Sequence, residues 1–204
     1  YINKEALQKE LGLKVDRDIP MIGLISRLAD QKGLDLVAKI IDDLLNLKIQ
    51  FVLLGTGDNK YHVLFEKMAK AHPRNTSINL KFDATLAQKI YAGSDLFLIP
   101  SRYEPCGLGQ MISFKYGAIP VVRQTGGLKD SVTEFDAKTR EGNGFTFEEY
   151  THNRLFAAIK KGLSLYNNKE TWSELVSKVM ALDYSWNASA VRYVELYNKM
   201  LHNK

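Results

Sequence analysis

Two cations and one acid stand where they could handle a phosphorylated ligand. Arg27 and Lys32 are five positions apart in the loop Ser-Arg-Leu-Ala-Asp-Gln-Lys-Gly, which follows one apolar run, and Glu104 follows another. A forked guanidinium and a compact ammonium together suit a diphosphate. A pair of solvated surface cations is the alternative, and the spacing alone does not decide between the two.

Glycine-rich turns follow four of the apolar runs. They contain Gly33, Gly55 with Gly57, Gly107 with Gly109, and Gly126 with Gly127. Glycine lets the backbone approach a ligand closely, and a helix that starts at such a turn offers free N–H groups to an anion. The Gly55 turn lacks the third glycine of a dinucleotide fingerprint, so a plain strand-to-helix turn explains it slightly better. Four such turns, with two cations among them, still favour a phosphate-bearing ligand.

Glu104 lies beside a predicted helix start. Pro105 suits the first turn of a helix, and the amides of Gly107, Leu108 and Gly109 then form a potential anion site. The Glu104 carboxylate could satisfy those amides itself. Alternatively, the amides hold a phosphate while Glu104 contacts another part of the same ligand.

Short apolar runs alternate with helical patterns, and this order predicts a doubly wound, mostly parallel α/β sheet of Rossmann-like type. Most of the runs are continuously apolar, as expected for strands covered on both faces. In such sheets, ligands bind beyond the carboxyl ends of the strands, where the cations, the glycines and Glu104 stand. Strands are predicted over Met21–Ser26, Phe51–Gly55, Ile78–Phe82, Leu96–Pro100, Pro120–Arg123 and Gly144–Phe147.

The helical patterns continue after the last predicted strand. We therefore expect a single domain over residues 1–204, with an α/β core over 1–150 and a helical C-terminal part over 151–204. The aromatic residues of the last helices are expected to pack rather than to stack on bases. Helices are predicted from the apolar stripe Leu34, Val37, Ile41 and Leu44, and over Val63–Ala71, Leu86–Ala92, Leu108–Tyr116, Leu155–Tyr166, Thr171–Leu182 and Ala188–Leu201.

Composition excludes several classes of protein. A chain of 204 residues that is 45% hydrophobic suits one globular domain. Its one cysteine, Cys106, excludes an internal disulfide framework and a cysteine-rich zinc site, and the four histidines show no metal-ligand spacing. A net charge of +5 with dispersed lysines argues against a nucleic-acid binder. No apolar run approaches the ~20 residues that span a membrane, so we expect a cytoplasmic protein, or a plastid one if the source is a plant, without a membrane partner.

Four motifs, in order, resemble bacterial glycogen synthases and plant starch synthases. The resemblance covers nearly the whole chain, but only the C-terminal, nucleotide-sugar-binding half of that family. It implies one Rossmann-like half of a GT-B fold and a retaining transfer of glucose from a nucleotide donor to the non-reducing end of an α-1,4-glucan, with no metal or other cofactor. ADP-glucose is the expected donor, and UDP-glucose is the alternative. The motifs are Ser26-Arg27 with Gln31-Lys32-Gly33, Pro100–Leu108, Tyr116-Gly117 with Pro120–Leu128, and Tyr184-Ser-Trp186 with Ser189-Ala190.

The resemblance also implies roles for individual residues. Arg27 and Lys32 match the basic pair that contacts the donor diphosphate, and Glu104 matches the acid beside the donor glucose; these three are the predicted catalytic residues. Phe82 falls where the family usually presents an aromatic side chain to the base. The other predicted donor-binding residues are Gly55, Tyr103, Cys106, Gly107, Leu108, Gly109, Thr125, Gly126 and Gly127.

Two departures qualify the resemblance. Ile112 stands where many retaining transferases of this fold carry a second glutamate that contacts ribose, and Gly109 stands where threonine is common. Together with Cys106, Ile112 argues against sucrose synthase-like or lipid-directed relatives, which are the alternative enzymes, and it leaves the ribose contact open. A non-catalytic nucleotide- or glucan-binding module is the alternative outside enzymes.

The chain starts at Tyr1 without an initiator methionine and lacks the N-terminal domain that brings the glucan acceptor site in the family. It is therefore expected to be a piece of a longer chain that binds ADP or ADP-glucose but transfers little glucose alone.

Overall fold

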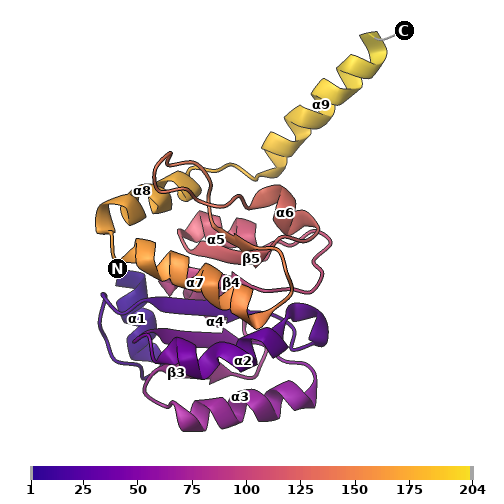
Figure 1. The fold of residues 1–204 in the computed structure, drawn as a ribbon. Coiled ribbons are helices and arrows are strands. Elements are labelled where there is room, and N and C mark those ends of the chain that lie inside the picture. The colour runs from indigo at the N-terminus through magenta and orange to yellow at the C-terminus, as the bar shows by residue number, and fades with distance from the viewer. Residues whose placement is uncertain (1, 203–204) are drawn as a thin grey trace.

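The computed structural model describes residues 2–202, and its helices and strands alternate along most of the chain (Figure 1). The predicted doubly wound α/β fold is confirmed. The elements are α1 (Ile2–Glu10), β1 (Met21–Ile25), the short 3-10 helix η1 (Asp30–Lys32), α2 (Leu34–Leu45), β2 (Gln50–Leu54), α3 (Asn59–Ala71), β3 (Thr76–Asn79), α4 (Ala84–Gly93), β4 (Leu96–Ile99), α5 (Gly109–Tyr116), β5 (Ile119–Arg123), α6 (Gly127–Ser131), β6 (Phe145–Phe147), α7 (His152–Tyr166), α8 (Lys169–Met180) and α9 (Trp186–His202).

The strands form one parallel sheet whose order is β3-β2-β1-β4-β5-β6. The chain builds outwards from β1 to β3, returns to the middle, and continues on the other side with β4. Strand β1 pairs with β4 through Ile22 opposite Leu96. Because the direction of winding changes between β1 and β4, the loops that follow these two strands leave the sheet side by side.

Both faces of the sheet are covered, as the continuously apolar strands predict. Along β2, Phe51 and Leu53 belong to a larger core shared with α2, α3 and α7, whereas Val52 and Leu54 belong to a smaller core with α1 and α4. Successive side chains of a strand point to opposite faces, so each strand supplies both cores. The sheet is thereby fixed rigidly between two helical layers.

Strand β3 lies earlier than expected. The sequence prediction Ile78–Phe82 is wrong, because the strand covers Thr76–Asn79 and the chain then turns into α4. The apolar character of Ile78 and Leu80 favoured the later register, but pairing of Thr76 with Phe51 sets the strand. As a result, Phe82 stands in a loop with 88% of its surface exposed.

Helix α1 was not predicted, and a buried ion pair holds it in place. Lys4 is 3% exposed, and its Nζ lies 2.7 Å from Asp95 Oδ2 at the start of β4. The same ammonium donates to the Arg17 carbonyl oxygen and to the Tyr166 hydroxyl. The Asp95 carboxylate also accepts a hydrogen bond from the Met21 amide, at the amino end of β1. These contacts tether α1 to the edge of the sheet opposite the loops after β1 and β4.

The last helix differs from all the others. Helix α9 has no buried residue, and it projects away from the sheet (Figure 1). Trp186, Tyr193 and Tyr197 are exposed, and the ring centroids of Tyr193 and Tyr197 lie 6.4 Å apart, so within residues 2–202 these aromatics do not pack into a core. Tyr184, just before α9, does stack on Phe114 with 5.8 Å between ring centroids. No described helix combines the length and apolarity needed to cross a membrane.

Candidate active site

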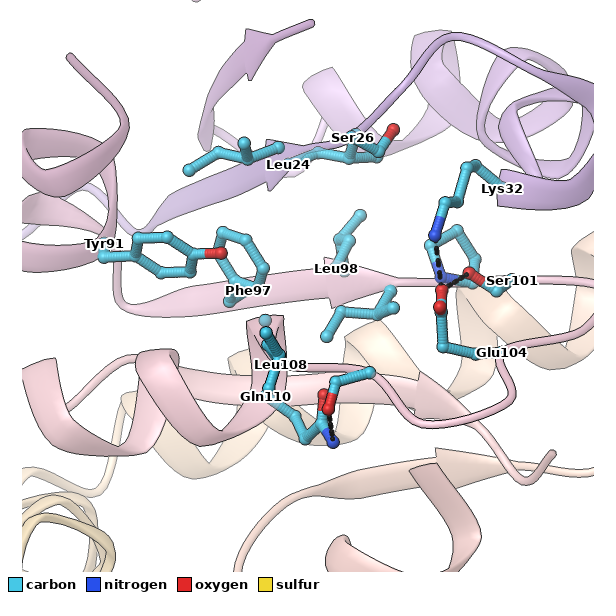
Figure 2. Close-up of a pocket in the computed structure, with 15 residues that line it drawn as sticks. Leu24, Ser26, Lys32, Tyr91, Phe97, Leu98, Ser101, Glu104, Leu108 and Gln110 are labelled. Atoms are coloured by element: carbon cyan, nitrogen blue, oxygen red, sulfur yellow. Dashed lines mark hydrogen bonds and ion pairs between the residues drawn. The ribbon is translucent and has the colours of Figure 1, made fainter. Parts of the chain in front are cut away.

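The predicted acid and one predicted cation meet at the middle of the sheet. Lys32 Nζ, at the end of η1, lies 2.6 Å from Glu104 Oε2, and the Ser101 hydroxyl donates to the same oxygen at 3.0 Å (Figure 2). The two side chains come from the loops after β1 and β4, which the strand order places next to each other. Both side chains are largely shielded from solvent, so their attraction is stronger than that of a surface pair.

Two hydrogen bonds between the loops after β1 and β4 position this ion pair. The backbone carbonyl of Gln31 accepts from the Arg102 amide at 2.8 Å, and the Gln31 side-chain amide donates to the Tyr103 carbonyl oxygen at 2.9 Å. Gly33 has φ of +71°, and a Cβ there would collide with the Pro100 carbonyl oxygen. Glycine is therefore required at this close approach of the two loops.

The loop after β5 packs against the backbone of Glu104. The Gly127 amide donates to the carbonyl oxygens of Glu104 and Pro105, at 3.1 and 3.2 Å. A side chain at Gly126 would strike the Glu104 carbonyl oxygen, and one at Gly127 would strike that of Cys106. The two glycines therefore let the loop after β5 pack directly against the backbone of the loop after β4, which carries Glu104.

Two cavities open at this edge of the sheet. The smaller, here called the acid cavity, measures about 140 Å³ and is lined by Lys32, Glu104 and the start of α5 at Gly107–Gln110. The larger, here called the aromatic cavity, measures about 540 Å³ and is lined by Arg27, Phe82 and Tyr116 among others. Ile25, Ser26 and Tyr91 line both cavities. An elongated ligand could thus lie across the two, with one end at Glu104 and the other near Phe82.

Some of the charged groups that line the aromatic cavity have partners within the protein, and others do not. Arg27 makes no side-chain hydrogen bond or ion pair to residues 2–202, so its charge is available to a ligand. Asp83, in contrast, caps α4 by accepting from the Leu86 amide at 2.9 Å. This bond, together with Lys81, lowers the pKa of Asp83. The free cation is therefore the group best able to recruit an anion.

The structure separates the predicted site residues into three groups. Lys32, Glu104, Gly107, Leu108 and Gly109 line the acid cavity. Arg27, Gly55 and Phe82 line the aromatic cavity.

The remaining predicted residues line neither cavity. Tyr103 and Cys106 are exposed members of the loop after β4, and Gly126 and Gly127 pack against the backbone of that loop. The backbone hydrogen bonds of Thr125 are to Arg123 and Leu128, in the loop after β5. Their contribution to the site is the backbone geometry described above.

Sequence reasoning missed several residues of the cavities. The sequence did not identify Ser101 and Tyr91 as site residues, because a serine after a strand and a tyrosine within a helix are common in any fold. Gln110 is buried in the acid cavity wall, where its amide nitrogen donates to the Gly107 carbonyl and its Oε1 has no partner among residues 2–202. In the same part of the chain, no three His, Cys, Asp or Glu side chains gather closely enough to hold a metal ion.

Comparisons with known proteins place the chain in a family. Residues 3–178 match the family model described as glycosyl transferases group 1. The chain is 55% identical over 205 residues to a protein of Thermosipho melanesiensis named glycogen synthase; the match covers 100% of this chain and 43% of that protein. A second glycogen synthase, from Fervidobacterium nodosum, is 56% identical, over 97% of this chain and 40% of its own length. The chain thus spans about two fifths of these relatives.

Solved structures agree with the fold. The catalytic domain of starch synthase IV from Arabidopsis thaliana, bound to ADP and acarbose, superposes with a TM-score of 0.88 at 42% identity, over 97% of this chain and 42% of that one. A sucrose-phosphate synthase from Thermosynechococcus elongatus, with a TM-score of 0.71 and 18% identity, shares the fold over 97% of this chain and 49% of its own. By sequence and structure, the chain belongs to the glycosyl transferases group 1 family.

Proposed function

We propose that this chain is the donor-binding part of a glycogen synthase, which transfers glucose from ADP-glucose to the non-reducing end of an α-1,4-glucan with retention of configuration. The observation that carries the proposal is the Lys32–Glu104 pair at one end of two adjoining cavities, with Phe82 at the other end. This layout suits a ligand that has a sugar at one end, a diphosphate in the middle and a base at the far end.

Each part of the site would act on one part of the donor. Departure of the nucleotide places negative charge on the diphosphate and positive character on the sugar carbon. Arg27, Lys32 and the amides at the start of α5 can stabilise the first charge without a metal ion. The Glu104 carboxylate can hold glucose hydroxyls and favour the oxocarbenium-like carbon.

The nature of the base and the acceptor is also part of the proposal. Support for ADP comes from the starch synthase IV structure, which holds ADP, and from the relatives named glycogen synthase. Because the chain spans about two fifths of those relatives, we propose that the remainder contributes the acceptor site and that this chain alone transfers little glucose. The bacterial relatives and the single cysteine support a cytoplasmic location.

Calorimetric titration of the chain with ADP and with UDP tests the proposal. We expect ADP to bind more tightly than UDP. Arg27→Ala is expected to weaken ADP binding roughly tenfold or more, because a charge-assisted contact is typically worth about 1.5–3 kcal/mol. Arg154→Ala is the matched control, since Arg154 pairs with Glu149 and lines neither cavity. Absence of ADP binding, or equal affinity of the wild type and Arg27→Ala, contradicts the proposed donor site.

The acceptor part of the proposal has its own test. The purified chain, given ADP-glucose and a glucan primer, is expected to release ADP without extending the primer, or to show no turnover at all. Clear elongation of the glucan by this chain would show that the acceptor site does not require the remainder of the protein.

A further inference from the structure

The hydroxyl of Tyr91 is a polar group of the site without a role in the contacts described above. Tyr91 lies in the last turn of α4 and is 8% exposed, and among residues 2–202 its Oη makes no hydrogen bond. Among residues 2–202, Gln110 Oε1 is the one fully buried polar side-chain atom without a partner, so the unbonded Tyr91 hydroxyl keeps some surface open to the cavities that it lines. An unpaired hydroxyl that opens into a cavity is a candidate to bond a ligand.

Two aromatic neighbours fix the direction of this hydroxyl. The Tyr91 ring packs on Phe97, with 4.5 Å between centroids, and stacks on Tyr116 at 6.2 Å. These contacts hold the ring so that its hydroxyl end is directed towards the other residues of the acid cavity (Figure 2). Tyr91 is thus preorganised, and a ligand would not have to order it.

The hydroxyl lies beside the start of α5. A Cβ built on Gly109, the first residue of α5, would be 3.4 Å from Tyr91 Oη. The N-cap residue, Leu108, gives the helix no side-chain hydrogen bond, and the Leu108 carbonyl accepts from the Ile112 amide. The first amides of a helix have no partners within the helix and favour an anion. The first amides of α5 and the Tyr91 hydroxyl are therefore donors without a partner among residues 2–202, at one wall of the acid cavity.

We propose that Tyr91 Oη donates a hydrogen bond to a phosphate of the nucleotide, beside the amides at the start of α5. The inference rests on the proposed function and adds a donor-binding residue to it. Tyr91 lines both cavities, so it stands where the diphosphate would pass between the sugar end and the base end. Ribose is the other part of the ligand within reach, but the unpaired amides of α5 favour the charged phosphate.

The protonation state of Tyr91 fits this role. Burial raises the pKa of its hydroxyl to about 12. The phenol therefore keeps its proton at neutral pH and can act as a donor to an anion.

Tyr91→Phe in this chain, titrated with ADP by calorimetry, tests the inference. We expect ADP to bind about tenfold more weakly, the usual effect of losing one hydrogen bond to a charged group. The melting temperature is expected to stay nearly the same, because the hydroxyl makes no hydrogen bond to residues 2–202 and the ring is kept. Tyr61→Phe is the matched control; it removes a hydroxyl bonded to Asp30 outside both cavities and should leave ADP affinity unchanged.

Titration with adenosine separates phosphate from ribose. If Tyr91 contacts a phosphate, Tyr91→Phe binds adenosine as the wild type does. Equal weakening of adenosine and ADP would assign the hydroxyl to the ribose or base and overturn the inference. If the wild type binds no ADP, the proposed function itself fails; if the wild type and Tyr91→Phe bind ADP equally, only the inference fails.

A second substitution tests whether a hydroxyl supplied from another residue can replace that of Tyr91. A Cβ on Gly109 would meet its neighbours at 3.4–3.5 Å, which is ordinary contact, and Gly109 does not have the positive φ of Gly107. Gly109→Ser can therefore place a new hydroxyl at nearly the same point. We expect it to restore most of the ADP affinity lost in Tyr91→Phe. No recovery of ADP affinity in the double variant would show that a hydroxyl at this point does not bind the phosphate and would overturn the inference.

Discussion

Two of the lysine–carboxylate pairs that join distant parts of the chain are both shielded from solvent and nearly equal in length, but they differ in their further partners. Lys4–Asp95 is 2.7 Å long and Lys32–Glu104 is 2.6 Å. The first lies at the amino ends of the strands, where backbone and tyrosine partners complete its hydrogen bonds. The second lies at the carboxyl ends, has Ser101 as its further partner, and faces a cavity. The Lys4–Asp95 pair, whose hydrogen bonds are completed by the protein, stabilises the fold. The Lys32–Glu104 pair can still form hydrogen bonds with a ligand.

The largest expected effect would come from breaking the Lys4–Asp95 pair. Lys4→Met leaves the Asp95 carboxylate buried without its cation, and such a loss typically costs about 3–5 kcal/mol of the free energy of unfolding. Urea unfolding measures it. Lys14→Met is the matched control: Lys14 is 70% exposed in its pair with Asp16 and should change stability by less than about 1 kcal/mol.

A further variant sharpens this prediction. Asp95→Asn, added to Lys4→Met, removes the uncompensated charge and is expected to restore part of the lost stability. If Lys4→Met is as stable as the wild type, the buried pair is not the anchor that the contacts suggest.

Breaking the Lys32–Glu104 pair should affect ADP affinity more than stability. Lys32→Met leaves Glu104 with the Ser101 hydroxyl as a partner and beside a cavity that admits water, so we expect a smaller loss in the free energy of unfolding than in Lys4→Met. ADP affinity is expected to fall roughly tenfold, because a cation that contacts the diphosphate is lost. A large loss of stability with unchanged ADP affinity would make the two pairs alike and remove the contrast.

Glu104→Gln should have a smaller effect on binding. Glutamine has nearly the same shape, and the substitution removes a negative charge close to the proposed diphosphate. We therefore expect ADP affinity to stay within about twofold of the wild type, which is less than 1 kcal/mol, and stability to be retained. Calorimetry and urea unfolding check both. A tenfold loss of ADP affinity would assign Glu104 to the nucleotide rather than to the sugar.

The smallest expected effect concerns pH. Because the pKa of Tyr91 is raised to about 12, the ratio of wild-type to Tyr91→Phe affinity for ADP should stay constant from about pH 8 to pH 10.5. A tyrosine with the ordinary pKa of about 10 would lose its donor within this range. A ratio that falls towards one near pH 10 would therefore show that the hydroxyl is exposed to water rather than buried.

The sequence was informative where one physical signal dominated. Continuous apolar runs identified the sheet, and the rule that ligands bind at the carboxyl ends directed attention to Arg27, Lys32 and Glu104. Helix α1 was missed because its buried face includes Lys4 and Gln8, which a hydrophobic pattern cannot reveal. Strand β3 was shifted because its own residues are mostly polar. Tyr91 could not be found from sequence, since its role depends on a contact with Gly109 across two helices.

The pairing of β1 with β4 has a consequence for folding kinetics. Lys32 and Glu104 are 72 positions apart, and they meet only when β4 returns to the middle of the sheet beside β1. Closing so long a loop costs chain entropy before the contacts compensate for it. The β1–β2–β3 unit alone carries Arg27, Lys32 and Phe82 but not Glu104 or α5. If nucleotide is present during refolding, we expect it to bind only to chains in which β1 and β4 have paired. The time course of nucleotide binding would then follow the formation of this pairing.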